Sequence, residues 1–185
     1  MRRLALIAAL LTGGAARAQD GRSWVIVSPN AEYAGEQVAS GASCRFTVRR
    51  GEQVLWSAER CFGDRGDPRF LSADGERVLV LYAFPETKGG MEKALAGELF
   101  HRGQVVRQYR VGQFVRDYKP LFAGRKHFYW LEGALGQPGV PPGLTKDGTG
   151  VELNTLDGKR HVVHFDGRAP PMKPAPKPKK KKKKW

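Results

Sequence analysis

Residues 68–81 read PRFLSADGERVLVL, and this stretch indicates the fold class of the chain. Its centre, Ser72-Ala73-Asp74-Gly75, is typical of a tight turn, because Asp bonds to nearby backbone and Gly adopts positive φ at little cost. The run from Val78 to Leu81 is continuously apolar, which favours a strand that is packed on both faces. We therefore expect a strand that enters the turn and a second strand in the interior of a layered sheet structure.

Similar segments occur earlier and later in the chain. Residues 20–27, DGRSWVIV, resemble residues 74–81, DGERVLVL, which lie 54 positions further on. Residues 124–131, GRKHFYWL, have the same shape about 50 positions after that, without the Asp. Each segment places a turn before several β-branched or aromatic residues, so each predicts a strand.

Three hairpins are predicted between and after these segments. In residues 44–56, 97–109 and 151–165, apolar and polar residues alternate on both sides of a turn that contains glycine. The expected unit is a strand, a loop and a hairpin of about 50 residues, and it occurs nearly three times. Little helix is expected; residues 91–96 suit one or two turns within a loop, because glycines flank them.

These motifs carry a resemblance to one broad family. The segment 68–80, together with RGEQVLW at 50–56 and RGQVV at 102–106, resembles the repeats of β-propellers over about two-thirds of the body of the chain. The resemblance implies an all-β fold and carries over no functional residue. Propellers usually have four or more blades. The sequence therefore leaves three arrangements of the repeated antiparallel hairpins open: a sandwich, a small barrel or an incomplete propeller-like stack.

The N-terminus predicts export. Two arginines precede an apolar run over residues 4–11, and Ala16-Arg17-Ala18 suits signal-peptidase cleavage before Gln19. We interpret residues 1–18 as a signal peptide, which places the protein in the periplasm or outside the cell. The apolar run is too short to span a bilayer, and no later segment is long and apolar enough to do so.

The C-terminus is a segment of unusual composition. We interpret residues 169–185 as a disordered tail, because it is rich in proline and lysine. Its basic residues are Lys173, Lys177, Lys179, Lys180, Lys181, Lys182, Lys183 and Lys184. Such a segment would be attracted to anionic envelope surfaces, either lipid phosphates or acidic polysaccharide. Nucleic acid is a less favoured partner, because the chain is exported.

The body, residues 19–168, carries a much smaller excess of positive charge for its length than the two ends of the chain. Of the 32 basic residues in the chain, three lie in the signal and eight in the tail, which leaves 21 against 18 acidic residues and a net charge of +3. A folded nucleic-acid domain would carry its excess charge on the body. The two cysteines, Cys44 and Cys61, predict one disulfide, because export permits oxidation and only one pairing exists.

Candidate sites in the body are few. His161 and His164 would point to opposite faces of a strand, so they predict no metal site. The acids around Asp64 and Asp67 suit a polar turn better than a calcium loop. Alternation across Phe128, Tyr129 and Trp130 sends Phe128 and Trp130 to one face and Tyr129 to the other, where an aromatic ring could stack on a sugar or a partner protein.

The sequence shows no catalytic set, no metal site and no cofactor motif. The leading hypothesis is a non-enzymatic exported β-domain that binds or scaffolds at the cell envelope, with the tail contacting anionic surfaces. The alternative is an envelope carbohydrate binder or a hydrolase that uses a cleft lined by loops. A pocket that collects acids or histidines would favour the alternative. The sequence leaves enzyme activity, the natural ligand and the oligomeric state open.

Overall fold

The computed structural model describes residues 23–121, 124 and 126–168. The predicted signal segment, residues 1–18, and the predicted tail, residues 169–185, lie outside the described residues, as do all eight tail lysines. The described part is almost entirely β, as the sequence predicts, and its strands form three antiparallel sheets, none of which closes into a barrel.

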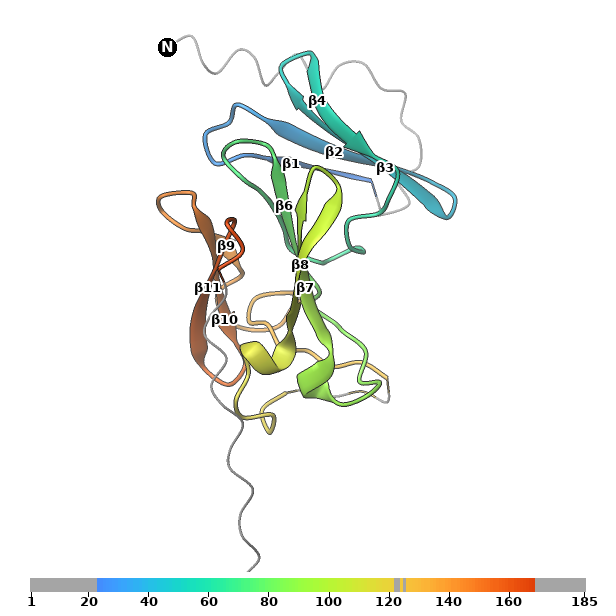
Figure 1. Cartoon of the computed structure of the whole chain (residues 1–185). Coiled ribbons are helices and arrows are strands. Elements are labelled where there is room, and N and C mark those ends of the chain that lie inside the picture. Colours follow the sequence, from blue (N-terminus) through green and yellow to red (C-terminus); the bar gives the residue numbers. More distant parts are fainter. Residues whose placement is uncertain (1–22, 122–123, 125, 169–185) are drawn as a thin grey trace, which may run out of the picture.

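Each sheet follows the order of its strands in the chain (Figure 1). Sheet A consists of β1 (Trp24–Val27), β2 (Ala34–Ser40), β3 (Ser43–Arg50) and β4 (Gln53–Ala58). Sheet B consists of β5 (Arg69–Leu71), β6 (Arg77–Leu81), β7 (Leu95–His101) and β8 (Gln104–Arg110). Sheet C consists of β9 (Gly143–Leu144), β10 (Gly150–Thr155) and β11 (Lys159–His164).

Sheet B lies between the other two sheets, and strand β6 shows why. Val78 and Val80 are buried against residues of sheet A, whereas Leu79 and Leu81 are buried against residues of sheet C. A strand that is covered on both faces has no position for a polar side chain, and this explains the unbroken apolar run. The prediction of a doubly buried strand over residues 78–81 is confirmed.

The contact between sheets A and B is an aromatic cluster. Phe46 is fully buried at its centre, with ring centroids 5.3 Å from Trp24, 5.4 Å from Trp56 and 4.7 Å from Phe62. Phe62 also meets Phe100 of sheet B edge-on at 4.7 Å. Tilted and edge-on ring pairs of this kind contribute beyond their buried area.

The contact between sheets B and C is larger and mostly aliphatic. Leu99 of sheet B and Val151, Leu153 and Val163 of sheet C belong to one buried cluster. The segment between β8 and β9 completes this cluster with Phe114, Phe128, Trp130 and Leu131. Residues of a long connection thus form part of the core between sheets B and C.

The same turn joins the first and second strands of each of the three sheets. In the central turn, the Ser72 hydroxyl donates to Asp74 Oδ1 at 2.5 Å, and the Arg77 backbone N–H donates to Ser72 Oγ at 2.9 Å. The N–H of Glu76 donates to Asp74 Oδ1 at 3.0 Å, and Gly75 has a φ of 71°. Residues 28–33 and 145–150 repeat these hydrogen bonds with Ser28 and Asn30, and with Thr145 and Asp147.

All three predicted hairpins are present, as β3–β4, β7–β8 and β10–β11. The predicted correspondence between residues 20–27 and residues 74–81 is wrong. Judged by the shared turn, β1, β5 and β9 are the first strands of their sheets, so residues 24–27 correspond to residues 69–71 and not to residues 77–81. Strand β1 is also exposed on one face, where Val25 is 61% and Val27 is 47% accessible, because it lies in an outer sheet.

The predicted strand at residues 124–131 is also wrong. In the described residues of this segment, only isolated bridges form, from His127 to Glu86 and from Leu131 to Thr155. The segment crosses from the β6–β7 loop to strand β10, so no single neighbour can pair with it along its length. The predicted alternation of its side chains is nevertheless confirmed, since Phe128 and Trp130 are buried and Tyr129 is half-buried.

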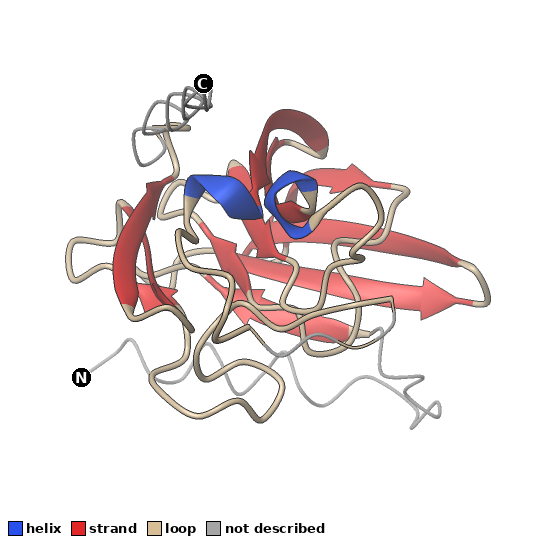
Figure 2. Cartoon of the chain, turned by 90° about the horizontal axis from the view of Figure 1, so that it is seen from below, coloured by secondary structure: helices blue, strands red, loops and turns tan. Residues whose placement is uncertain are grey.

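The described helices are two 3₁₀ turns, η2 (Met91–Lys93) and η3 (Val111–Gln113). They lie next to each other in Figure 2, and the N–H of Val111 donates to the carbonyl of Ala94 at 3.0 Å. This pairing brings the end of the β6–β7 loop to the end of β8, and it forms one wall of the site described below.

Candidate binding cleft

An open cleft of about 740 Å³ lies at one end of sheet B. Loops build most of it: residues 64–67 before β5, residues 82–93 after β6, and the segment around residues 127–129. Its volume falls within the range of about 300–1,000 Å³ that is usual for ligand sites. Loops placed on a rigid sheet are the common location of binding residues.

One wall of the cleft is aromatic. Phe84 stacks on His127 with ring centroids 4.9 Å apart and an interplanar angle of 20°, and it lies 4.4 Å from the ring of Tyr129. Phe84 is 38% exposed, and all three rings line the cleft. An exposed large ring on a pre-arranged wall offers an apolar face to a ligand.

Backbone hydrogen bonds hold this wall in place. The N–H of Phe128 donates to the carbonyl of Pro85 at 3.3 Å, and the N–H of Thr87 donates to the carbonyl of Lys126 at 2.7 Å. The indole N–H of Trp130 donates to the carbonyl of Tyr82 at 2.7 Å. Because Phe128 and Trp130 are anchored in the core, alternation directs Tyr129 toward the cleft.

The lining also contains Asp67, whose carboxylate is already occupied. Its Oδ1 accepts the N–H of Ala83 at 3.0 Å, and its Oδ2 accepts the N–H of Asp64 at 2.8 Å. Burial raises the pKa of Asp67, and these hydrogen bonds work against that shift. The carboxylate therefore joins the loop before β5 to the end of β6, which is a structural role.

A second acid lies on strand β7 and is hydrogen-bonded to a residue of the cleft lining. Glu98 is buried and accepts hydrogen bonds from the Tyr82 hydroxyl at 2.6 Å and from Gln108 Nε2 at 2.9 Å. Burial, together with the hydrogen bond to Glu98, raises the pKa of Tyr82, so this phenol stays protonated at neutral pH. Tyr82 lines the cleft, and the network fixes its ring there.

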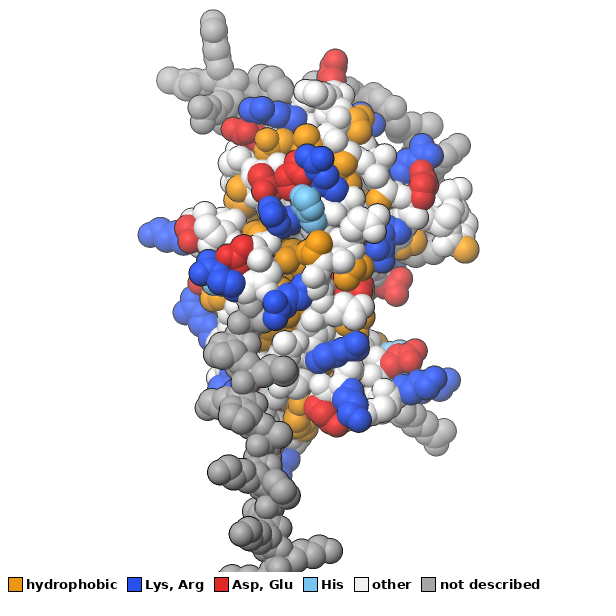
Figure 3. Space-filling model, viewed as in Figure 1, with side chains coloured by type: hydrophobic (Ala, Val, Ile, Leu, Met, Phe, Trp, Pro, Cys, Tyr) orange, Lys and Arg blue, Asp and Glu red, His pale blue; other side chains and the backbone are white. Residues whose placement is uncertain are grey.

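Charged side chains complete the lining. Arg65, Lys88, Lys93 and Arg110 provide positive charge, and Asp64 and Glu86 provide negative charge. On the face of the molecule drawn in Figure 3, basic and acidic side chains are interspersed, as expected for a body with a small net charge.

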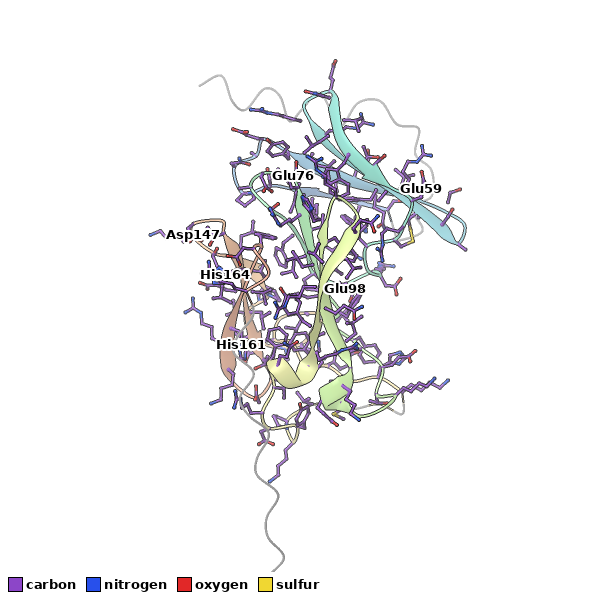
Figure 4. The ribbon with its side chains drawn as sticks, in the orientation of Figure 1. Glu59, Glu76, Glu98, Asp147, His161 and His164 are labelled. Atoms are coloured by element: carbon purple, nitrogen blue, oxygen red, sulfur yellow. A yellow bond between two sulfur atoms is a disulfide. The ribbon has the colours of Figure 1, made fainter. Side chains whose placement is uncertain are left out.

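The structure places the other sequence candidates away from this cleft. Cys44 and Cys61 form a disulfide between β3 and the loop after β4, as predicted. His161 pairs with buried Leu153 and packs edge-on against Phe114, whereas His164 pairs with Gly150. Figure 4 shows the two histidines at different heights along β11, and their opposite orientation is confirmed by the strand register. Burial lowers the pKa of His161.

Sequence reasoning found Tyr129 as a candidate platform but missed Phe84 and His127. Phe84 follows the apolar run of β6 after only two residues, and Pro85 after it marks a loop; this was the available signal. His127 gave no signal of its own. Within the described ranges, no group of three or more His, Cys, Asp or Glu residues is placed to hold a metal ion.

Comparison with models of known protein families and with curated proteins gave no match. The two helices of the described ranges are single 3₁₀ turns, and no helix there has the length and apolar character needed to cross a membrane.

Proposed function

We propose that this protein is an exported, non-enzymatic binding domain of the cell envelope that holds a saccharide in the cleft. The observation that carries the proposal is the wall of Phe84, His127 and Tyr129, three rings in contact beside an open cavity of about 740 Å³. Sugar rings present C–H faces that pack on aromatic rings, and hydroxyl groups that need polar partners. The cleft offers both kinds of group.

The structural roles of two acids at the cleft, Asp67 and Glu98, favour binding over hydrolysis. A glycosidase needs two carboxyl groups that flank the bond to be cleaved, one as an acid and one as a base or nucleophile. Both oxygens of Asp67 accept backbone N–H groups, and buried Glu98 accepts from Tyr82 and Gln108. Asp67 and Glu98 are therefore committed to holding loops and strands. Asp64, Glu86 and His127 also line the cleft, so hydrolysis stays the alternative function.

A glycan array tests the proposal on the full-length mature protein. We expect binding that is lost in Phe84→Ala and retained in Val25→Ala, a matched loss of an exposed apolar side chain on the outer face of sheet A. If no glycan binds in a manner that depends on Phe84, the proposed function is wrong.

The tail adds a second part to the proposal, which rests on its sequence. The lysines from Lys179 to Lys184 would bring the folded body to anionic lipids or acidic polysaccharide, at about 1 kcal/mol for each lysine near a membrane. Replacing these six lysines by glutamine should abolish salt-sensitive binding to vesicles that contain anionic lipid. The melting temperature of the body should stay the same; equal vesicle binding by both proteins would contradict this role.

A further inference from the structure

The cleft has a basic wall beside the aromatic one. Lys88, Lys93 and Arg110 line it, and within the described ranges none of the three forms an ion pair with a carboxylate. Six arginines of the described body do form such pairs, for example Arg45 with Glu59 at 2.5 Å and Arg77 with Asp74 at 2.9 Å. The charge on the cleft wall therefore remains available to a ligand.

The fold positions these cations together. Lys93 ends η2 and Arg110 ends β8, and Arg110 Nη1 donates to the carbonyl of Lys93 at 3.2 Å. The backbone N–H of Arg110 donates to Gln113 Oε1 at 2.6 Å, which fixes the end of the strand. Lys88 lies in the adjoining loop, which is closed by the hydrogen bond from the Gly90 N–H to the carbonyl of Thr87 at 3.0 Å.

The remaining polar groups suit hydroxyls. Asp64 and Glu86 line the cleft, and neither carboxylate has a described cation within ion-pair distance. Carboxylates are acceptors only, so they can receive hydrogen bonds from sugar hydroxyls. The cleft thus combines an aromatic wall, hydroxyl acceptors and the three cations Lys88, Lys93 and Arg110.

We infer that the ligand is an acidic saccharide, whose ring packs on Phe84 and Tyr129 and whose anionic group lies against Lys88, Lys93 and Arg110. This inference rests on the proposed function and names the class of sugar. The anionic group is a carboxylate, as in a uronic acid, or a phosphate or sulfate ester. All three groups accept charge-assisted hydrogen bonds from ammonium and guanidinium groups.

Titration calorimetry on the full-length mature protein tests the inference. The probes are a uronic acid trisaccharide, the same trisaccharide with its carboxyl groups reduced to alcohols, and a phosphorylated and a sulfated sugar. We expect the uronate, or one of the esters, to bind at least about tenfold more tightly than the neutral trisaccharide, since hydrogen bonds to charged groups are the stronger ones. The strongest of the anionic probes identifies the acid group.

Three variants locate the preference. The double variant Lys88→Gln/Lys93→Gln should lose most of the preference for the acid while its affinity for the neutral sugar stays within about twofold, because only the charged contact is removed. Phe84→Ala should weaken both sugars. The variant with glutamine at 179–184 should keep the preference, because the inference assigns that preference to Lys88, Lys93 and Arg110.

Three other outcomes would overturn the inference. Equal affinity for acidic and neutral sugars, lost in Phe84→Ala, overturns the inference and leaves the proposed function standing. A preference that survives in Lys88→Gln/Lys93→Gln but disappears in the tail variant assigns anion selectivity to the tail and overturns the inference. If neither sugar binds in a manner that depends on Phe84, the inference falls together with the proposed function.

Discussion

The two faces of sheet B are buried in different ways. The face toward sheet A meets a small aromatic cluster centred on Phe46, and a disulfide ties the loop after β4 to β3 beside it. The face toward sheet C meets a larger aliphatic cluster that is completed by the connection between β8 and β9. Strand β6 supplies aliphatic side chains to both contacts, valines to one and leucines to the other. The aromatic character of the first contact therefore comes from the residues that pack against the strand.

We expect this difference to separate the residues that stabilise the fold from those that form the proposed binding site. On the side of sheet A the contact is formed by aromatic rings, and the disulfide beside it links β3 to the loop after β4. On the side of sheet C the longer connection supplies His127 and Tyr129 to the cleft, and the β6–β7 loop supplies Phe84. We expect changes in the first contact to affect folding most, and changes in the cleft to affect binding most.

The largest effect is expected from Phe46→Ala. Phe46 is fully buried and its ring contacts three other rings, so its truncation leaves a cavity that costs about 3–5 kcal/mol of unfolding free energy. Val38→Ala, on the outer face of the same sheet, should cost less than about 1 kcal/mol. Urea unfolding followed by circular dichroism measures both, and similar losses would show that the aromatic cluster is not the main support of sheet A.

The next effect is expected from the disulfide. The bond closes a loop over a sequence separation of 17 residues, for which chain entropy gives about 3 kcal/mol. It also holds Phe62, the residue after Cys61, in place. The N–H of Phe62 donates to Gln37 Oε1 at 2.7 Å. The double variant Cys44→Ser/Cys61→Ser should lower the urea midpoint while ligand binding in the cleft survives below that midpoint. Loss of binding in a protein that is still folded would contradict the separation of the two sides.

A smaller effect is expected from the turn that opens sheet B. Ser72→Ala removes the donor to Asp74 and the acceptor of the Arg77 N–H, which should cost about 1–2 kcal/mol. Ser28→Ala makes the same change in sheet A, where the turn flanks an outer sheet, and should cost less. The comparison is read from urea midpoints, and a larger loss in Ser28→Ala would place more of the stability in sheet A than we expect.

The smallest effect concerns pH. Hydrogen bonds from Thr145 and Thr149 lower the pKa of Asp147 to about 2 from 3.8, so the carboxylate stabilises the folded state above pH 4 and loses this contribution as the pH falls toward 2. The matching residue in sheet A is Asn30, which does not titrate. Asp147→Asn should flatten the dependence of stability on pH between 4 and 2, and Asn30→Asp should steepen it. Unchanged slopes in both variants would show that these turns do not contribute to acid unfolding.

Much of the fold follows from local patterns. The hairpins were predictable from alternation around glycine, and the burial of β6 on both faces from its unbroken apolar run. The correspondence of strands between the three sheets was not predictable, because the shared turn has three different sequences, Ser-Pro-Asn, Ser-Ala-Asp and Thr-Lys-Asp. Only the hydrogen bonds show that Ser28, Ser72 and Thr145 are equivalent; a search for a hydroxyl residue two positions before Asp or Asn would have found all three.

The sequence by itself determined the all-β class, the hairpins, the disulfide pair and the sides to which Phe128, Tyr129 and Trp130 point. Alternation and turn chemistry act between neighbours in the chain, so they can be read without a structure. Only the tertiary structure decided that Phe84 meets His127 and Tyr129, and that Lys93 meets Arg110. These residues are separated in the chain, and they meet because the β6–β7 loop, the end of β8 and the segment at residues 127–129 lie at the same end of sheet B.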